Sequence, residues 1–235
     1  TKTDVSLVDC TFCNCTVANL RGGGACMKSC NCSIDHCRFE HCAAHASGAL
    51  EVTNCPAVAI NQSVFHSNTA FRYGAGQLDG KDPTSTLLLK DTNFTGNRAQ
   101  RWIGALRLQH HNGTIEHCNF HDNSAHCFGT IFDFNTTPSS QLICFTTFTN
   151  NSAVEKSAAI DTFHILYAGT ITDCLFMDSS SGTEEGQSIL IESDLAAVAI
   201  TNCQFSGTRE QEIAVVHSTA KLTEHGNHFM EKHLM

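Results

Sequence analysis

The fold of this chain is decided by the stretch IEHCNFHDNSA at residues 115–125, because variants of it recur along the whole sequence. Each variant has an aliphatic residue, a small residue three positions later and a phenylalanine two positions after that. The phenylalanines are 24 to 29 residues apart, at Phe12, Phe39, Phe65, Phe94, Phe120, Phe148, Phe176, Phe205 and Phe229. A period this steady indicates one structural unit stacked many times.

The residue types at equivalent positions of the repeat indicate which kind of repeat fold the chain adopts. The phenylalanine and the small residue two positions before it point to the same side of a strand, and the residues around them are mostly polar. About ten residues later comes a second phrase, a small pair followed by an aliphatic residue, as in Gly48-Ala49-Leu50 and Gly104-Ala105-Leu106. A unit of about 27 residues cannot bury its apolar face alone, whereas a stack of such units can.

These columns predict an all-β fold, a single-stranded parallel β-helix of about nine rungs with two or three short strands each. We expect it to be right-handed because parallel crossovers are right-handed. An antiparallel sandwich would not require the same residue at the same phase in every unit, and a leucine-rich repeat would need a denser leucine pattern. In the middle rungs an asparagine follows the phenylalanine, and we expect it to form an internal side-chain ladder at a tight turn. The ladder residues are Phe65 with Asn68, Phe94 with Asn97, Phe120 with Asn123, and Phe148 with Asn151.

Length and charge narrow the possible partners. The 235 residues suffice for one elongated domain, 1–235, and only 16% of them are charged, with a net charge of −9. Nucleic acid is an unexpected partner because no basic stripe is present. No apolar run is long enough to span a membrane. The chain opens in strand-like sequence and ends after a degenerate repeat, so we expect a fragment of a longer polypeptide with flanking domains.

The two phrases resemble the repeats of polymorphic outer membrane proteins, which pair Phe-x-x-Asn with Gly-Gly-Ala-aliphatic. The first element stands at 65–68, 94–97, 120–123 and 148–151, and the second at 23–25, 48–50 and 104–106. At both ends of the chain, Cys, Ser or Thr replaces the asparagine. The resemblance implies a right-handed β-helix with a surface or adhesive role, and it carries over no catalytic residue and no cofactor. More distantly, the repeat resembles the pectin-lyase-type β-helix, whose members include polysaccharide lyases and hydrolases.

The 14 cysteines allow three interpretations. They can be small apolar fillers of a stacked core. Equivalent cysteines in adjacent rungs can instead form disulfides, as Cys10 with Cys37, Cys15 with Cys42, or Cys174 with Cys203, because the rung spacing lies within the required Cα range. A metal site in the clusters at 10–15 and 26–32 is the third, although strand alternation would divide those side chains between inside and outside. The 14 histidines are read as polar surface or as a pH-responsive or metal-binding face.

One stripe of residues is a candidate active site. Arg107, Asp133 and Asp161 each lie 13 residues after a phenylalanine, so we expect them to stack in one column with the two carboxylates about 5 Å apart. His110, His111 and His164 follow nearby. Such a stripe could bind calcium or act as acid and base on a polysaccharide. Surface ladders of charge are also ordinary on a β-helix, and the irregular pair before Asp133 could displace it.

Seven Asn-x-Ser/Thr sequons occur, and Asn112 and Asn135 are the best glycosylation candidates because we expect them in loops. Three functions remain open. The first is a non-enzymatic, adhesin-like or structural scaffold that binds a protein or glycan along its side, outside the cell or at its surface. The second is a carbohydrate-active enzyme using the stripe around Asp133 and Asp161. The third is an intracellular structural component of a larger assembly, which free cysteines would suit.

Overall fold

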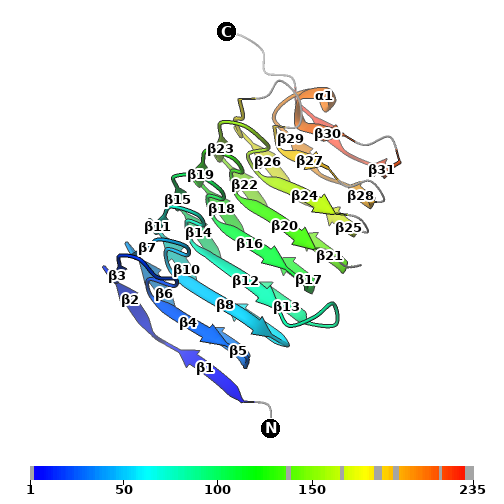
Figure 1. Cartoon of the computed structure of the whole chain (residues 1–235). Coiled ribbons are helices and arrows are strands. Elements are labelled where there is room, and N and C mark those ends of the chain that lie inside the picture. Colours follow the sequence, from blue (N-terminus) through cyan, green and yellow to red (C-terminus); the bar gives the residue numbers. More distant parts are fainter. Residues whose placement is uncertain are drawn as a thin grey trace.

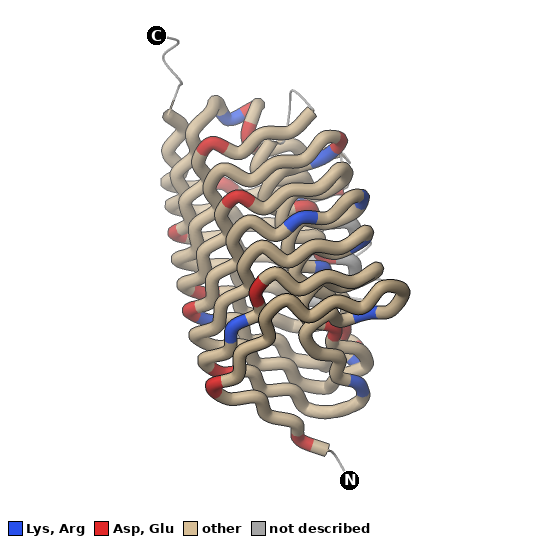
Figure 2. Tube along the Cα trace, turned by 90° about the vertical axis from the view of Figure 1, so that its left-hand side faces the viewer, with Lys and Arg blue, Asp and Glu red and all other residues tan. Residues whose placement is uncertain are grey.

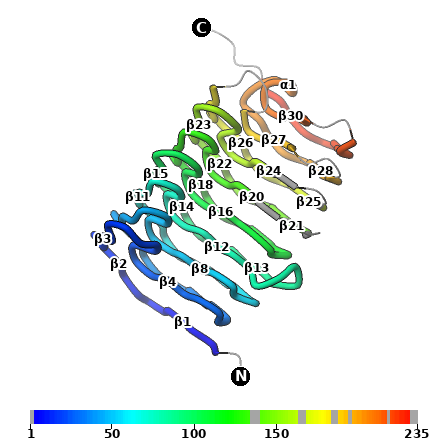
Figure 3. Tube along the Cα trace, in the orientation of Figure 1, coloured from blue at the N-terminus to red at the C-terminus, as the bar shows by residue number. Residues whose placement is uncertain are grey.

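The structure is a computed structural model that describes residues 3–135, 139–164, 167–182, 187–192, 196–216 and 219–230. The chain winds into a parallel β-solenoid whose N-terminal and C-terminal turns lie at opposite ends (Figure 1). Colour runs smoothly from blue to red along the axis, so each turn contacts only its neighbours in sequence (Figure 3). This arrangement confirms the predicted stack of repeated units.

Four parallel sheets run along the solenoid. Sheet A holds, in order, β1 (Asp4–Val8), β5 (Asn31–Asp35), β9 (Ala57–Asn61), β13 (Thr86–Lys90), β17 (Asn112–Glu116), β21 (Ser139–Cys144), β25 (Tyr167–Thr172), β28 (Ala197–Thr201) and β31 (Lys221–His225). Sheet B holds β2 (Thr11–Cys13), β6 (Arg38–Glu40), β10 (Val64–His66), β14 (Asn93–Thr95), β18 (Asn119–His121), β22 (Thr147–Thr149), β26 (Leu175–Met177), β29 (Gln204–Phe205) and β32 (His228–Phe229).

Sheets C and D complete each turn. Sheet C holds β3 (Thr16–Val17), β7 (Ala43–Ala44), β11 (Thr69–Ala70), β15 (Arg98–Ala99), β19 (Ser124–Ala125) and β23 (Ser152–Ala153). Sheet D holds β4 (Ala25–Lys28), β8 (Leu50–Cys55), β12 (Gly76–Gly80), β16 (Leu106–Gln109), β20 (Ile131–Asn135), β24 (Ile160–His164), β27 (Ile189–Ile191) and β30 (Ile213–Val215). A middle turn therefore carries four strands, more than the predicted two or three, because the two-residue strands of sheet C are too short to leave a periodic signal.

Within the described residues the one helix is α1 (Arg209–Glu212), and no helix there is long and apolar enough to cross a membrane. Charged residues are sparse along the tube, which is mostly uncharged in the view of Figure 2.

The phenylalanine column forms the centre of the core. From Phe39 to Phe205 the rings are fully buried, and they stack nearly parallel with centroids 4.7 to 5.0 Å apart. Phe65 pairs in register with Phe94, and Phe94 with Phe120. The small-residue column is buried beside it, as predicted. The second phrase packs as tightly, since a Cβ on Gly104 would overlap the carbonyl oxygen of Gly129.

The asparagine column is a continuous buried ladder, as predicted. Asn97 Nδ2 donates to Asn123 Oδ1 at 3.0 Å and to the Phe65 carbonyl at 2.9 Å. The Asn97 backbone N–H donates to the same Asn123 Oδ1 at 3.1 Å. Asn68 and Asn123 repeat this pattern, and all four ladder asparagines have no exposed surface. The ladder therefore satisfies the backbone groups that a tight turn would otherwise leave unpaired inside the protein.

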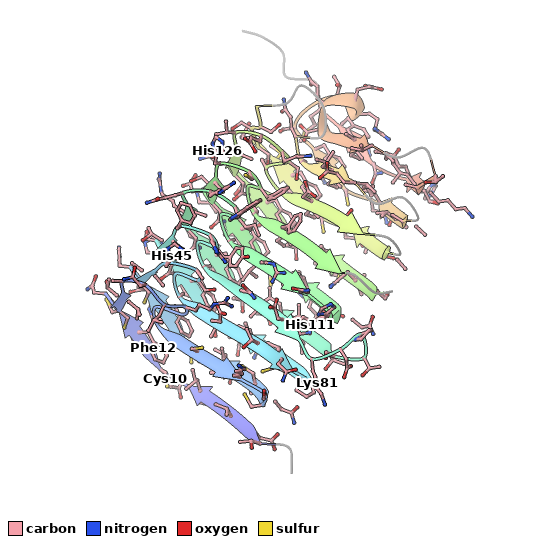
Figure 4. All side chains as sticks on the ribbon, viewed as in Figure 1. Cys10, Phe12, His45, Lys81, His111 and His126 are labelled. Atoms are coloured by element: carbon pink, nitrogen blue, oxygen red, sulfur yellow. The ribbon has the colours of Figure 1, made fainter. Side chains whose placement is uncertain are left out.

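The corners of the solenoid explain several histidines. The turns from sheet A to sheet B and from sheet B to sheet C each place one residue in the left-handed region, and some turns from sheet D to sheet A do so as well. Asn, Asp, His and Gly are favoured in this region. His36, His41, His110 and His117 occupy such corners with φ between 50° and 56°. Figure 4 shows two further histidines, His45 and His126, on the turns at one edge of the solenoid. Backbone geometry thus accounts for part of the histidine content that composition alone assigned to surface polarity or metal binding.

The ring stack yields a prediction about stability. Replacing Phe120 by leucine removes two stacked ring contacts, at 4.8 Å to Phe94 and 5.0 Å to Phe148, while keeping an apolar side chain. We expect the free energy of unfolding to fall by about 1–3 kcal/mol, because each aromatic pair adds to the effect of burial. Urea denaturation measures this change. The exposed Phe145→Leu is the control, and equal effects of both variants would show that the stack adds nothing.

Candidate functional site

An aromatic groove lies on the outer side of sheet D. Its volume is about 420 Å³, and it is lined by Tyr73, Trp102, Ile103, Arg107, Phe128, Phe132, Lys156 and Glu192. Arg107 and Phe132 come from neighbouring strands β16 and β20, where they pair in register. Tyr73, Ile103 and Phe128 come from the turns before β12, β16 and β20, where they also pair from turn to turn. The residues that line the groove therefore stack along the axis of the solenoid, as the core residues do, but on the outer surface of the protein.

Aromatic rings shape the floor and one wall of the groove. Phe128 stacks on Phe132 with a centroid distance of 4.3 Å. The only tryptophan of the chain, Trp102, is 36% exposed, and the guanidinium of Arg101 lies 4.8 Å from its ring centroid. Exposed aromatic faces with few polar groups between them are typical of ligand-binding surfaces.

Charged groups stand at both ends of the groove, each paired with a partner of opposite sign. Arg107 Nη1 lies 2.8 Å from Asp79 Oδ1, and its guanidinium lies 5.7 Å from the ring centroid of Tyr73. Burial raises the pKa of Asp79, and the charge of Arg107 opposes that rise. At the other end Lys156 forms an ion pair with Glu192. The groove thus offers hydrogen-bonding groups without a strong net charge.

Asp161 lies beneath this second ion pair. Its side chain is fully buried in the outward column of β24, between Phe132 of β20 and Leu190 of β27. Neither carboxylate oxygen has a hydrogen-bond partner among the described residues. Burial raises the pKa of Asp161 well above its ordinary value, Glu192 raises it further, and Lys156 opposes the rise. Because its side chain has no exposed surface, the Asp161 carboxyl is closed to a bound substrate.

The predicted column of Arg107, Asp133 and Asp161 is wrong at its middle member. Arg107 pairs with Phe132, and Phe132 pairs with Asp161, whereas Asp133 pairs with Leu108 and Thr162. One residue fewer separates the column phenylalanine from sheet D in this turn than in the turns on either side. Because side chains alternate along a strand, this single residue moves Asp133 from the outer column to the interior. The two carboxylates consequently face opposite sides of the sheet.

Of the three predicted histidines, the structure places His110 and His111 outside the groove lining. His110 is a corner residue after β16 with φ 56°, and His111 is fully buried, where desolvation lowers its pKa to about 4. Figure 4 shows His111 beside the turn that joins sheets D and A, and His111 is not one of the residues that line the groove. His164 is the last residue of β24, and its side chain lies outside the described part of the structure.

The structure bears on each of the three interpretations of the cysteines. All 14 cysteines are free thiols. Among the described residues, no group of three or more His, Cys, Asp or Glu side chains could hold a metal ion. Cys118 shows the filler role, because its backbone N–H donates to Thr146 Oγ1 and its thiol donates to the Glu116 carbonyl at 3.3 Å. A thiol there occupies the place that a hydroxyl takes in neighbouring turns.

The two glycosylation candidates lie in strands, and the expectation that they stand in loops is wrong. Asn112 is the first residue of β17, and Asn135 is the last residue of β20. Asn112 is exposed, but its Nδ2 donates to the Pro83 carbonyl at 2.8 Å and its Oδ1 accepts from the Ser140 backbone. The side chain of Asn135 lies outside the described part of the structure.

The groove lining itself was not singled out from the sequence. A signal was present, because Tyr73, Ile103 and Phe128 each stand directly before the glycine of the second phrase. These large residues occupy the same position of the repeat in successive turns. They indicate a continuous row of side chains along the outer surface. The exposed tryptophan in the same segment points to it as well.

Comparison with known proteins identifies the class. The family model described as "Right handed beta helix region" matches residues 3–132, more than half of the chain, and the chain belongs to this family. The match confirms the predicted right-handed β-helix. A search of curated proteins finds no match. A search of solved structures finds none either.

Proposed function

We propose that this protein is a β-helix scaffold that binds an extended glycan in the aromatic groove over sheet D. The supporting observation is the coincidence of partly exposed aromatic rings with paired charged groups along five successive turns, from Tyr73 to Glu192. Aromatic faces pack against the apolar faces of sugar rings, and groups such as those of Arg107 and Glu192 can hydrogen-bond to hydroxyls. The axial repeat of the groove suits a linear ligand laid along the solenoid.

A location at the cell surface or outside the cell belongs to the same proposal. The likeness of the two phrases to polymorphic outer membrane protein repeats supports it, and so does the exposed sequon at Asn112. Mass spectrometry of the protein from its native source would detect a glycan on Asn112. A protein that carries no glycan and remains in a soluble intracellular fraction would favour the structural alternative.

The only tryptophan lies in the groove, so its fluorescence reports binding directly. Titration with soluble neutral and acidic oligosaccharides is expected to shift the emission of Trp102. Phe132→Ala should weaken binding about tenfold or more, because buried aromatic contacts dominate such interfaces. The Trp102 reporter is intact in that variant.

Phe145→Asn is the matched control. It removes an exposed aromatic ring outside the groove lining, at a corner with φ 49° that asparagine tolerates. No shift with any glycan, or equal affinity of the Phe132 and Phe145 variants, would contradict the proposal. Products of cleavage in the same mixtures would instead indicate the carbohydrate-active enzyme, and binding of a protein alone would indicate a protein scaffold.

A further inference from the structure

Most cysteines of the small-residue column point their thiols at backbone carbonyls. Cys37, Cys118, Cys174 and Cys203 each approach a carbonyl of the preceding turn at 3.5 to 3.7 Å and the carbonyl two residues before them at 3.2 to 3.3 Å. Thiols engaged in this way are directed at carbonyls of the strand ladder, and the side chains of Cys174 and Cys203 also interact with each other. Stacking of cysteines in adjacent turns therefore does not by itself single out one pair.

Cys30 and Cys55 are arranged differently. They lie in adjacent turns at the corner that leads from sheet D to sheet A, after β4 and at the end of β8. Their Sγ atoms face each other at 3.9 Å, and both residues are buried. The backbones run side by side there, since the Ser29 N–H donates to the Thr53 carbonyl at 3.0 Å. Neighbouring strands are close enough for a disulfide.

Two more sulfurs border this pair. Cys32 Sγ lies 3.0 Å from Met27 Sδ, and both residues are buried in the same first turns of the solenoid. The thiol of Cys32 is therefore engaged with a thioether, whereas those of Cys30 and Cys55 face each other.

We infer that Cys30 and Cys55 form a redox-active pair that closes to a disulfide and links the first two turns of the solenoid. The co-reactant is a low-molecular-weight disulfide. The thiolate of one cysteine attacks a sulfur of that disulfide, which gives a mixed disulfide and releases one thiol. The thiolate of the other cysteine then attacks the mixed disulfide, forming the Sγ–Sγ bond and releasing the second thiol. The protein loses two protons and two electrons, and the co-reactant gains both.

The site sets the rate and the consequence of this exchange. Burial raises the pKa of Cys30 to about 11, so thiolate is scarce at neutral pH and the reaction accelerates as the pH rises. The bond would join residues 25 positions apart and constrain the unfolded chain. It would also hold the first turn of the stack, which has a neighbouring turn on one side only among the described residues.

The test is disulfide mapping after incubation of the folded protein with oxidised glutathione at mildly alkaline pH. Fragmentation mass spectra of proteolytic peptides should show Cys30 joined to Cys55 as the main intramolecular bond, with the thermal midpoint raised by several degrees. Cys55→Ser should lose both effects, and Cys203→Ser, the matched control, should retain them. Circular dichroism checks that both variants fold.

Two results would overturn the inference. One is a dominant bond elsewhere, such as Cys174 to Cys203, which would show that stacking and not sulfur orientation decides. The other is glutathione retained on Cys30 while the Cys55 thiol stays free, because the resolving step would then fail.

Discussion

Replacing Asn123 by leucine is expected to lower the free energy of unfolding by about 4 kcal/mol, because it breaks the buried ladder at its centre. The Asn97 backbone N–H and the Phe94 carbonyl each lose their bond to the Asn123 side chain, and Asn97 Nδ2 loses one of two acceptors. Each buried polar group left without a partner costs about 1–3 kcal/mol. Leucine has a similar size, so the loss reports hydrogen bonding more than volume.

Chemical denaturation followed by circular dichroism measures this loss. Asn93→Leu is the matched control, because Asn93 is exposed on β14 in the same part of the solenoid. We expect that control to stay within about 0.5 kcal/mol of the natural protein. If Asn123→Leu were as stable as the control, the ladder would be a consequence of stacking and not a cause of it.

The second large effect concerns the pH dependence of stability through Asp133. This carboxyl is buried in the interior column of β20, where burial raises its pKa to about 7, while a hydrogen bond from Gln141 and the charge of Arg107 oppose the rise. Gln141 stands in sheet A between Gly113 and Gly169, whose missing side chains leave room for it. The interior therefore holds a polar pair where other turns pack aliphatic residues.

The direction of the pH effect follows from proton binding. Between pH 4 and 7 the folded protein binds the Asp133 proton and the unfolded chain, with an ordinary aspartate pKa of 3.8, releases it. Stability should therefore fall as the pH rises through this range, by about 4 kcal/mol in total. Asp161 contributes in the same direction, since burial also raises its pKa.

Asp133→Asn is expected to flatten this slope and to stabilise the protein at pH 8, because the amide cannot ionise. Denaturation midpoints measured from pH 5 to pH 8 test this, with the exposed corner variant Asp91→Asn as the control. Asparagine tolerates the positive φ of 47° at that corner. A slope that Asp133→Asn leaves unchanged would show that Asp133 is ionised in the folded protein.

The architecture of this protein could be predicted from its repeated residues alone. The repeated positions of Phe120 and Asn123 predicted the parallel β-helix, its register and its buried ladder. The prediction was possible because every turn buries the same residue types at the same positions of the repeat. The small-residue column was likewise interpretable from sequence, since its side chains point inward beside the phenylalanines.

The arrangement of side chains on the outer side of the turns could not be predicted in this way. The interior placement of Asp133 depends on a turn shorter by one residue, and such a change reverses the face of a side chain without disturbing the repeat. The aromatic groove joins Tyr73, Phe132 and Glu192 from different turns. The contact of Cys30 with Cys55 depends on side-chain orientation, which a shared phase does not fix. Periodicity specifies the backbone stack, whereas corner geometry and rotamers specify which side chains meet on the outer surface and at the corners.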